Sequence, residues 1–148
     1  SCLFRPILNR PQAMSSTREI YTDFYARGAK NLYIWTVEHI LPQGDNLPQD
    51  WVTMVAAGDA VEAGRIQKAL VHKLGNLTLT GYNSQLSNMS FDKKRDRKDS
   101  GNRHIGYKNG LALNTMLAQA TYWTKAEIEQ RTELIVQKAM EVFRMKHP

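Results

Sequence analysis

Three short blocks of sequence, in a fixed order, restrict how this chain folds. The first is Thr36–Gln43 (TVEHILPQ), which carries the adjacent pair Glu38 and His39. The second is Leu74–Thr80 (LGNLTLT), and the third is Asn83–Lys94 (NSQLSNMSFDKK). The order predicts a strand that delivers a carboxylate and an imidazole, a second strand opened by an asparagine, and an Asn-rich helix start.

The elements around these blocks follow from local patterns. Leu32–Ile40 is rich in aromatic and branched residues and predicts the first strand. Residues 42–50 hold Gly, two prolines, Asn and Asp, which predicts a loop, and Trp51 is expected to anchor that loop in the core. Residues 77–80 predict a short second strand, and Gly81 supplies the turn after it. Trp35 and Trp123 are also expected to be core anchors.

Helices are expected before and between the strands. The capping box Ser16–Glu19 predicts a helix that ends near Gly28. Its core-facing residues would be Ile20, Tyr21, Phe24 and Tyr25. Asp59 is the expected N-cap of a helix over about residues 60–72. The inward residues of that helix would be Val61, Ile66, Ala69 and Leu70.

Two further helices are predicted at the end of the chain, over about residues 111–122 and 125–145. A capping box, Thr124–Glu127, opens the second of them. Its apolar stripe consists of Ile128, Ile135, Ala139, Val142 and Phe143.

The pair Glu38 and His39 suits phosphodiester hydrolysis, which needs a base for water, a Lewis acid at the phosphate and cations for the developing charge. The imidazole of His39 titrates near neutrality and is the natural base. In a straight strand the two side chains point to opposite faces, so they serve one site only if the strand ends or bulges, which Pro42 favours. Mg²⁺ needs few protein oxygens, and Glu38 with an Asn carbonyl oxygen would suffice. Taken alone, the pair fits a half-buried strand histidine beside a surface carboxylate better than a catalytic site, and only the three blocks together favour catalysis.

Composition is consistent with this interpretation. The 148 residues carry a net charge of +6, the sign expected for a partner rich in phosphates. The single cysteine, Cys2, excludes an intramolecular disulfide, suits a reducing cytosol and excludes paired Cys-x-x-Cys zinc ligands. No apolar run approaches the roughly 20 residues of a membrane span, and no signal peptide is visible.

The mixed-charge run at residues 92–99 (DKKRDRKD) is typical of a solvated helix face. It lies directly behind the expected site, so Lys93, Lys94 and Arg95 are candidates for contact with phosphates. Residues 100–110 contain several turn signals and predict a surface loop. His72 falls at a predicted helix end, where a role in stability is expected.

The order and spacing of the three blocks resemble those of the HNH, or His-Me finger, endonucleases. The motifs EHILPQ, LGNLTL and NSQLSNMSFDKK are more specifically similar to those of the C-terminal nuclease domain of GmrSD-type restriction enzymes. This resemblance extends over about residues 17–143. These are modification-dependent (type IV) enzymes of bacterial phage defence. The resemblance implies an α+β fold in which a ββα-metal hairpin is embedded in a mostly helical domain.

The resemblance also implies a role for each matching residue. His39 would be the general base, and Glu38 would be an acidic metal ligand. Asn76 would brace the loop that carries the base. Asn83 best matches the third motif position as a metal ligand, and Asn88 is its rival. Asn in place of His at this position favours Mg²⁺ or Mn²⁺ over zinc.

The implied organisation is a nuclease domain over residues 16–148, preceded by an irregular segment, residues 1–15, that ends a linker from an upstream domain. That upstream domain, or a partner subunit, would hydrolyse nucleotide and sense modified phage DNA. No Gly-rich phosphate loop is present in these residues. The substrate would be DNA in the bacterial cytoplasm, with no membrane involved, and the domain alone would be a weak, sequence-indifferent nickase.

Two alternatives remain open. The first is a non-catalytic basic module, derived from a nuclease, that binds nucleic acid or a partner. The presence of His39, Asn76 and Asn83 favours the enzyme over this module. The second is an enzyme acting on RNA, and the lack of aromatic stacking residues in the basic run argues against it.

Overall fold

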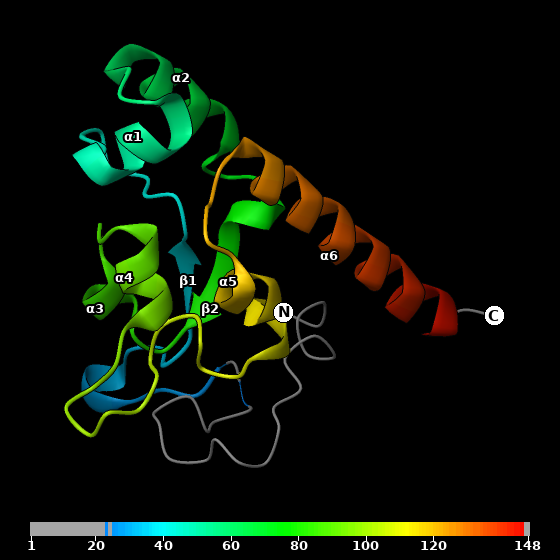
Figure 1. Cartoon of the computed structure of the whole chain (residues 1–148). Coiled ribbons are helices and arrows are strands. Elements are labelled where there is room, and N and C mark those ends of the chain that lie inside the picture. Colours follow the sequence, from blue (N-terminus) through cyan, green and yellow to red (C-terminus); the bar gives the residue numbers. More distant parts are fainter. Residues whose placement is uncertain (1–22, 24, 147–148) are drawn as a thin grey trace.

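The computed structural model describes residue 23 and residues 25–146, which form a mixed α+β structure (Figure 1). Its strands are β1 (Thr36–His39) and β2 (Leu77–Thr80). Its α-helices are α1 (Gln49–Ala56), α2 (Ala60–Leu70), α3 (Asn83–Leu86), α4 (Phe91–Asp96), α5 (Thr115–Gln119) and α6 (Lys125–Lys146). Short 3₁₀ turns occur at η4 (Ala29–Asn31), η5 (Leu74–Asn76) and η6 (Ala112–Asn114).

The two strands pair in antiparallel fashion, with Thr36 opposite Thr80 and His39 opposite Leu77. The second strand occupies the four residues that the sequence predicts. The first strand is shorter than the predicted range 32–40, because a strand extends only as far as its partner and β2 offers four residues. β1 therefore ends at His39, two residues before the buried Leu41.

The connection between β1 and β2 contains α1 and α2, which lie together at one end of the molecule (Figure 1). The predicted loop ends at Pro48, and α1 begins directly after it. Trp51 is fully buried, as predicted, and lies on α1, whose first two residues, Gln49 and Asp50, fall within the predicted loop. Its Nε1 donates to the carbonyl oxygen of Met89 at 2.9 Å, which fixes α1 against the segment before α4.

Asp59 caps α2 as predicted, since its carboxylate accepts from the backbone N–H groups of Val61 and Glu62. The predicted inward face is partly wrong. Val61 is 86% exposed and Ala69 is exposed, because the stripe of α2 that faces the protein runs through Ala63, Gln67 and Leu70. The amide of Gln67 donates to backbone carbonyls of the loop before α1, so a polar residue occupies part of this buried stripe.

The C-terminal part of the chain differs from the prediction in extent. In place of one helix over 111–122, η6 and the short α5 are present, and Ala120 is already extended. One half of the predicted capping box of α6 is present: the backbone N–H of Thr124 donates to the carboxylate of Glu127 at 2.7 Å, and the Thr124 hydroxyl donates to the same carboxylate at 2.6 Å. Ile128 is buried but Phe143 is 46% exposed, since the second half of α6 projects from the body (Figure 1).

Two other predictions are corrected within the described residues. Residues 100–110 are not simply a surface loop, because Ile105 and Tyr107 are buried. Tyr25 is 63% exposed, and residues 25–28 form a turn and an isolated bridge, so the predicted N-terminal helix does not extend to Gly28. The capping box at 16–19 and the residues Ile20, Tyr21 and Phe24 lie outside the described residues.

The core lies where the end of β1, α1, α4 and the start of α6 meet. Trp123 stacks on Phe91 with ring centroids 5.5 Å apart, and Trp51 meets Phe91 edge-on at 6.3 Å. These rings pack with a set of buried aliphatic side chains: Ile40, Leu41, Leu70, Leu86, Leu117 and Ile128. Since Ile40 and Leu41 directly follow His39, this core anchors the backbone at the end of β1.

The turn η5 lies against α6, and Gly75 makes that approach close. A Cβ at Gly75 would overlap the carbonyl oxygen of Ile128, so only glycine fits there. Arg131, on the next turn of α6, is buried and donates to the carbonyl oxygens of Gly75, Leu77 and Leu113. α6 thereby fixes the position of the segment that carries Asn76.

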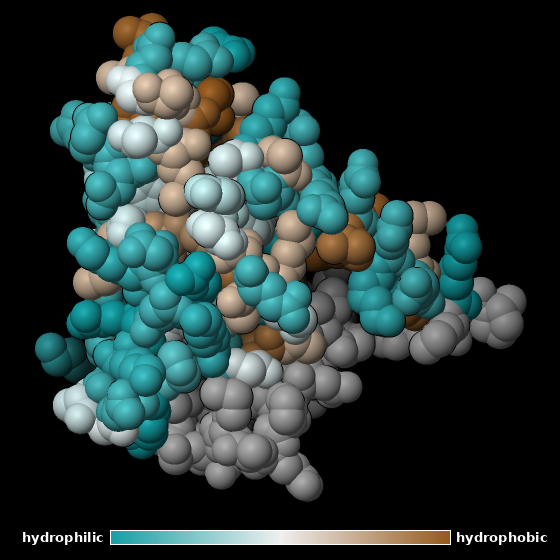
Figure 2. Space-filling view, in the orientation of Figure 1, coloured by the Kyte–Doolittle hydropathy of each residue, from teal (hydrophilic) through white to brown (hydrophobic). Residues whose placement is uncertain are grey.

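Polar and apolar side chains are unevenly distributed on the visible face of the molecule (Figure 2). On the face shown in Figure 2, hydrophilic side chains cover the region of α3 and α4, and apolar side chains are exposed beside α6. The exposed apolar residues of α6 include Leu134, Val136, Met140 and Phe143. Among the described residues, none of the helices has the length and apolar character needed to cross a membrane.

Candidate active site

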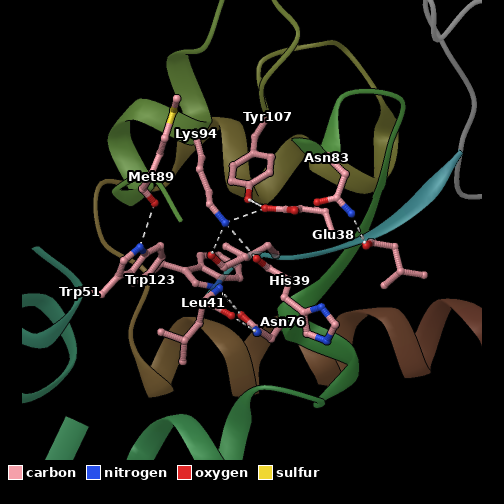
Figure 3. Close-up of polar contacts among 12 residues, drawn as sticks. Glu38, His39, Leu41, Trp51, Asn76, Asn83, Met89, Lys94, Tyr107 and Trp123 are labelled. Carbon is pink, nitrogen blue, oxygen red and sulfur yellow. Dashed lines mark hydrogen bonds and ion pairs between the residues drawn. The ribbon is translucent and has the colours of Figure 1, made fainter. Parts of the chain in front are cut away.

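A small polar pocket of about 110 Å³ lies at the end of β1. Its lining residues are Val37, Glu38, His39, Pro42, Gln43, Asn83, Ser87 and Asn88. Four of the residues that the sequence predicts for the site, Glu38, His39, Asn83 and Asn88, therefore border one pocket, although the side chains of Glu38 and His39 point to opposite faces of β1. Asn76 lies behind it, in the core, and the cluster around Glu38 is shown in Figure 3.

Glu38 is 3% exposed and is held by two side chains through one oxygen. Its Oε1 accepts from Lys94 Nζ at 2.6 Å and from the hydroxyl of Tyr107 at 3.2 Å. Burial raises the pKa of Glu38, and the adjacent Lys94 opposes that shift. Within the described part of the chain no hydrogen bond reaches Oε2, so this oxygen is the one that Glu38 can offer to a ligand in the pocket.

Lys94 is fully buried, and its three N–H donors all find acceptors. In addition to Glu38, it donates to the carbonyl oxygens of His39 at 3.0 Å and Ile40 at 3.1 Å (Figure 3). Burial lowers the pKa of Lys94, and Glu38 opposes that shift. The prediction that Lys94 contacts phosphate is therefore wrong: its ammonium group binds three consecutive residues at the end of β1.

The two neighbours of Lys94 in the basic run differ from it and from each other. Lys93 is exposed on α4 and remains a candidate for contact with phosphate. Arg95 is half-buried, and its guanidinium donates to Asp96 and to the carbonyl oxygen of Ala120. The positive charge of Arg95 is thus compensated by Asp96. Of the three basic residues, only Lys93 keeps the solvated position that the mixed-charge pattern predicts.

His39 is half-buried, and its Nε2 lies 3.3 Å from Nδ1 of His72. The two rings meet edge-on, with centroids 5.3 Å apart and planes inclined at 79°. Burial lowers the pKa of His39, and the nearby His72 and Lys94 lower it further. In Figure 3 the imidazole of His39 is directed away from the carboxylate of Glu38, as the alternation of a strand requires.

His72 is the member of this arrangement that the sequence prediction missed. It was expected to stabilise a helix end, but α2 ends at Leu70 and a turn then places His72 beside His39. The sequence feature that could have indicated this contact was the position of His72 just before the second block, Leu74–Thr80. Because β2 pairs with β1, the residues that precede β2 lie beside the end of β1.

Asn76 is fully buried and joins the segment after His39 to the segment before β2. Its Oδ1 accepts from the backbone N–H of Leu41 at 2.8 Å, and its Nδ2 donates to the carbonyl oxygens of Leu41 and Val71, each at 3.0 Å. Trp123 Nε1 also donates to Oδ1, at 3.2 Å. These contacts are those expected of a side chain that braces the loop carrying a base.

The two candidate asparagines of the third block occupy different surroundings. Asn83 is the first residue of α3, as predicted, and its Nδ2 donates to the carbonyl oxygen of Val37 at 2.8 Å. This bond fixes the amide beside β1. Asn88 is exposed in the turn after α3, and it makes no hydrogen bond to any part of the chain that the structure describes. Of the two amides, that of Asn83 is therefore the one held in a fixed position beside β1.

The donor set of the pocket consists mainly of oxygens. No group of three or more His, Cys, Asp or Glu side chains that could hold a metal occurs among residues 23 and 25–146. Glu38, Asn83 and Asn88 nevertheless border one pocket with carboxylate and amide oxygens, the ligands that Mg²⁺ and Mn²⁺ prefer. Since Mg²⁺ keeps several waters, these few oxygens fit such an ion.

Comparison with known proteins identifies the family. The family model described as GmrSD restriction endonucleases, C-terminal domain, matches residues 7–138, nearly the whole chain. No curated protein and no solved structure gives a significant match. The matched range includes both strands, the pocket residues and the brace at Asn76. The chain therefore belongs to the family of GmrSD restriction endonuclease C-terminal domains.

Proposed function

We propose that this domain is a metal-dependent DNA endonuclease of the HNH type that hydrolyses phosphodiester bonds. It would be the effector of a phage-defence restriction enzyme that acts on modified DNA. The observation that carries the proposal is the pocket at the end of β1, which gathers Glu38, His39 and Asn83 in a chain of a restriction endonuclease family. The order β1, β2, α3, with α3 against β1, supports the ββα interpretation.

His39 would act as the general base. Its Nε2 lies 3.3 Å from Nδ1 of His72; in the neutral tautomer that carries its proton on Nε2, this nitrogen would donate to His72 and leave Nδ1 to accept a proton. Water gives its proton to Nδ1 as its oxygen attacks phosphorus, and the 3′-oxygen leaves. The lowered pKa of His39 keeps the imidazole neutral, which is the form that this step requires.

Glu38, Asn83 and Asn88 would hold Mg²⁺ or Mn²⁺ with their oxygens. The bound ion would supply the Lewis acidity that stabilises the charged phosphate and the leaving oxygen. Lys94 orients Glu38 through Oε1 and ties down the carbonyl oxygens of the next two residues, so the end of β1 is rigid. Asn76 holds the backbone at Leu41, which limits movement of His39.

DNA would approach over the face that carries the pocket. The net charge of +6 favours a polyanionic partner, and Lys93 is an exposed cation on α4. Contacts of this kind hold the phosphate backbone without selecting a sequence. The isolated domain is therefore expected to nick DNA without sequence preference, and recognition of modified bases would belong to another domain or subunit.

The direct test is nicking of supercoiled plasmid with Mg²⁺ or Mn²⁺, compared with EDTA. His39→Ala should lower the rate by about 100- to 10,000-fold, the usual contribution of a general base. Lys68→Ala, which changes an exposed residue of α2, is the control and should cleave as the wild type does. Equal rates for wild type and His39→Ala would remove His39 from the mechanism.

One observation favours a second candidate function, a non-catalytic module that binds nucleic acid. Glu38 is already paired with Lys94, which compensates the charge that a cation would otherwise meet. A module of this kind would retain plasmid in a gel-shift assay and leave it supercoiled with every metal. Cleavage that depends on His39 would exclude it.

A further inference from the structure

We propose that His39 and His72 form a second metal site, which takes a borderline divalent transition metal such as Zn²⁺ through their two imidazole nitrogens. This site is separate from the oxygen donors proposed for Mg²⁺. We further infer that its occupation inhibits cleavage. The binding step stands by itself, and the inhibition rests on the proposed function of His39.

The separation of the two nitrogens matches a shared tetrahedral ion. Zn²⁺ binds histidine nitrogens at about 2.0–2.1 Å, and tetrahedral ligand directions then place two nitrogens about 3.3–3.4 Å apart. His39 Nε2 and His72 Nδ1 are 3.3 Å apart. The distance between the two nitrogens thus needs no change for them to share one ion.

The ring positions agree with the same geometry. An ion lying in the plane of both rings, at the zinc–nitrogen distance, requires ring centroids about 5.2 Å apart. A straight N–H···N hydrogen bond with the observed nitrogen separation would instead place the centroids about 5.6 Å apart. The observed separation of 5.3 Å fits a shared ion, and it also fits a bent hydrogen bond when no metal is bound.

The buried brace at Asn76 holds the two histidine segments relative to each other. Its amide bonds the backbone of Leu41, two residues after His39, and that of Val71, the residue before His72. A metal therefore meets two ligands whose backbones are already positioned, and little ordering is needed on binding.

The chemistry and the exposure of the pair select the class of ion. Imidazole suits Zn²⁺, Cu²⁺ and Ni²⁺, whereas Mg²⁺ prefers oxygen ligands. His72 is exposed and His39 half-buried, so an ion reaches the pair from solvent. With only two protein ligands, waters complete the coordination, and binding should be weaker and more readily reversed than at a structural zinc site with four protein ligands.

Binding of this ion would fix His39 in the tautomer that cannot act as the general base. A neutral imidazole that gives the lone pair of Nε2 to a metal carries its proton on Nδ1. In His39, Nδ1 is the nitrogen proposed to accept the proton of water. With Zn²⁺ on Nε2, this nitrogen becomes a donor and cannot accept that proton, so cleavage should stop while the pocket oxygens still bind Mg²⁺.

The binding step is tested by calorimetric titration of the purified domain with Zn²⁺ alone. His72→Ala and His39→Ala should each weaken binding at this site on the order of tenfold or more. His72→Asn keeps a hydrogen-bonding side chain and should also lose the ion, whereas Lys73→Ala, the exposed neighbour, should bind as the wild type does. Unchanged Zn²⁺ affinity in folded His72→Ala and His39→Ala, checked by circular dichroism, would overturn the proposal.

The inhibition is tested by adding Zn²⁺ to the nicking assay at fixed, saturating Mg²⁺. Each variant is compared with its own zinc-free rate, and the Zn²⁺ concentration for half-inhibition should rise about tenfold or more in His72→Ala. Wild-type cleavage that Zn²⁺ leaves unchanged, despite calorimetric binding to the pair, would overturn the inhibitory role. If the wild type cleaves no DNA with any metal, the proposed nuclease function fails, and the calorimetric result still decides the metal site.

Discussion

Replacement of Lys94 by Met should strongly destabilise the protein, although the residue belongs to a run of charges typical of a solvated surface. Methionine nearly preserves the volume of the side chain and removes its ammonium group. The carboxylate of Glu38 is then left buried with Tyr107 as its remaining partner, and the carbonyl oxygens of His39 and Ile40 lose a donor.

The magnitude follows from the burial of both partners. The side chains of Lys94 and Glu38 are 0% and 3% exposed, so solvent cannot compensate the charge that remains. Removal of one partner from a buried ion pair costs about 3–5 kcal/mol of unfolding free energy. For a chain of this size that loss corresponds to a decrease in Tm of roughly 6–20 °C.

Urea denaturation followed by tryptophan fluorescence measures this change, since Trp51 and Trp123 lie in the same core. Lys93→Met is the matched control, because it removes the same charge from the exposed neighbouring position and should leave stability within about 0.5 kcal/mol. The double variant Glu38→Gln with Lys94→Met removes both charges. It should be more stable than the sum of the two single changes predicts, by roughly 0.5–3 kcal/mol.

Two results would refute this reasoning. If Lys94→Met costs less than about 1 kcal/mol, the pair is not a buried ion pair of the expected kind. If the effects of the single changes at Glu38 and Lys94 are strictly additive, the two groups do not interact in solution, and the assignment of Lys94 as the residue that orients Glu38 fails.

Four other predictions concern the brace, the α6 contact, the base and the metal ligands. Asn76→Ala should lower nicking and reduce stability by about 1–3 kcal/mol in urea denaturation, because it leaves buried backbone groups unpaired, and a variant with normal stability would contradict the brace. Gly75→Ala should lower Tm, since a Cβ overlaps the backbone of α6 at a cost of about 1–3 kcal/mol; an unchanged Tm would show that α6 can shift. The nicking rate should fall with decreasing pH only below 6.5, the ordinary pKa of His39, because a lowered pKa keeps the base neutral to more acidic values; a midpoint above 6.5 would argue against this base. In a Mg²⁺ titration, Asn83→Ala should raise the metal concentration required for nicking more than Asn88→Ala does, and the reverse order would assign the ligand to Asn88.

The sequence by itself determined the features that depend on neighbours within a few residues. Three such features were predicted correctly because each follows from local hydrogen bonding or alternation: the cap at Asp59, the contact of the Thr124 N–H with Glu127, and the four residues of β2. Large side chains such as Trp51 and Trp123 were predicted correctly as core residues, since their apolar area is buried in almost any compact arrangement.

The buried face of each helix was predicted less well, because the burial of a side chain depends on what packs against its turn of the helix. The pattern of α6 predicts an apolar stripe that continues to Phe143, yet burial decreases along the helix: Ile128 and Ile135 are buried, Ala139 and Val142 are half-buried, and Phe143 is 46% exposed. Arg131 and Gln67 are buried polar residues that no apolar pattern reveals. Their partners are backbone carbonyls distant in sequence, which only the folded chain brings within reach.

Within the site, the blocks predicted which residues gather, and the tertiary structure decided how they interact. The sequence placed Lys94 among solvated charges, although it follows Phe91 by three residues and therefore lies on the same buried face of α4. That face packs against β1, where the ammonium group meets Glu38. His72 reaches His39 only because β2 pairs with β1 in the observed register. Both contacts join residues more than thirty positions apart, so chain folding, and not local sequence, brings these charged and titratable groups together.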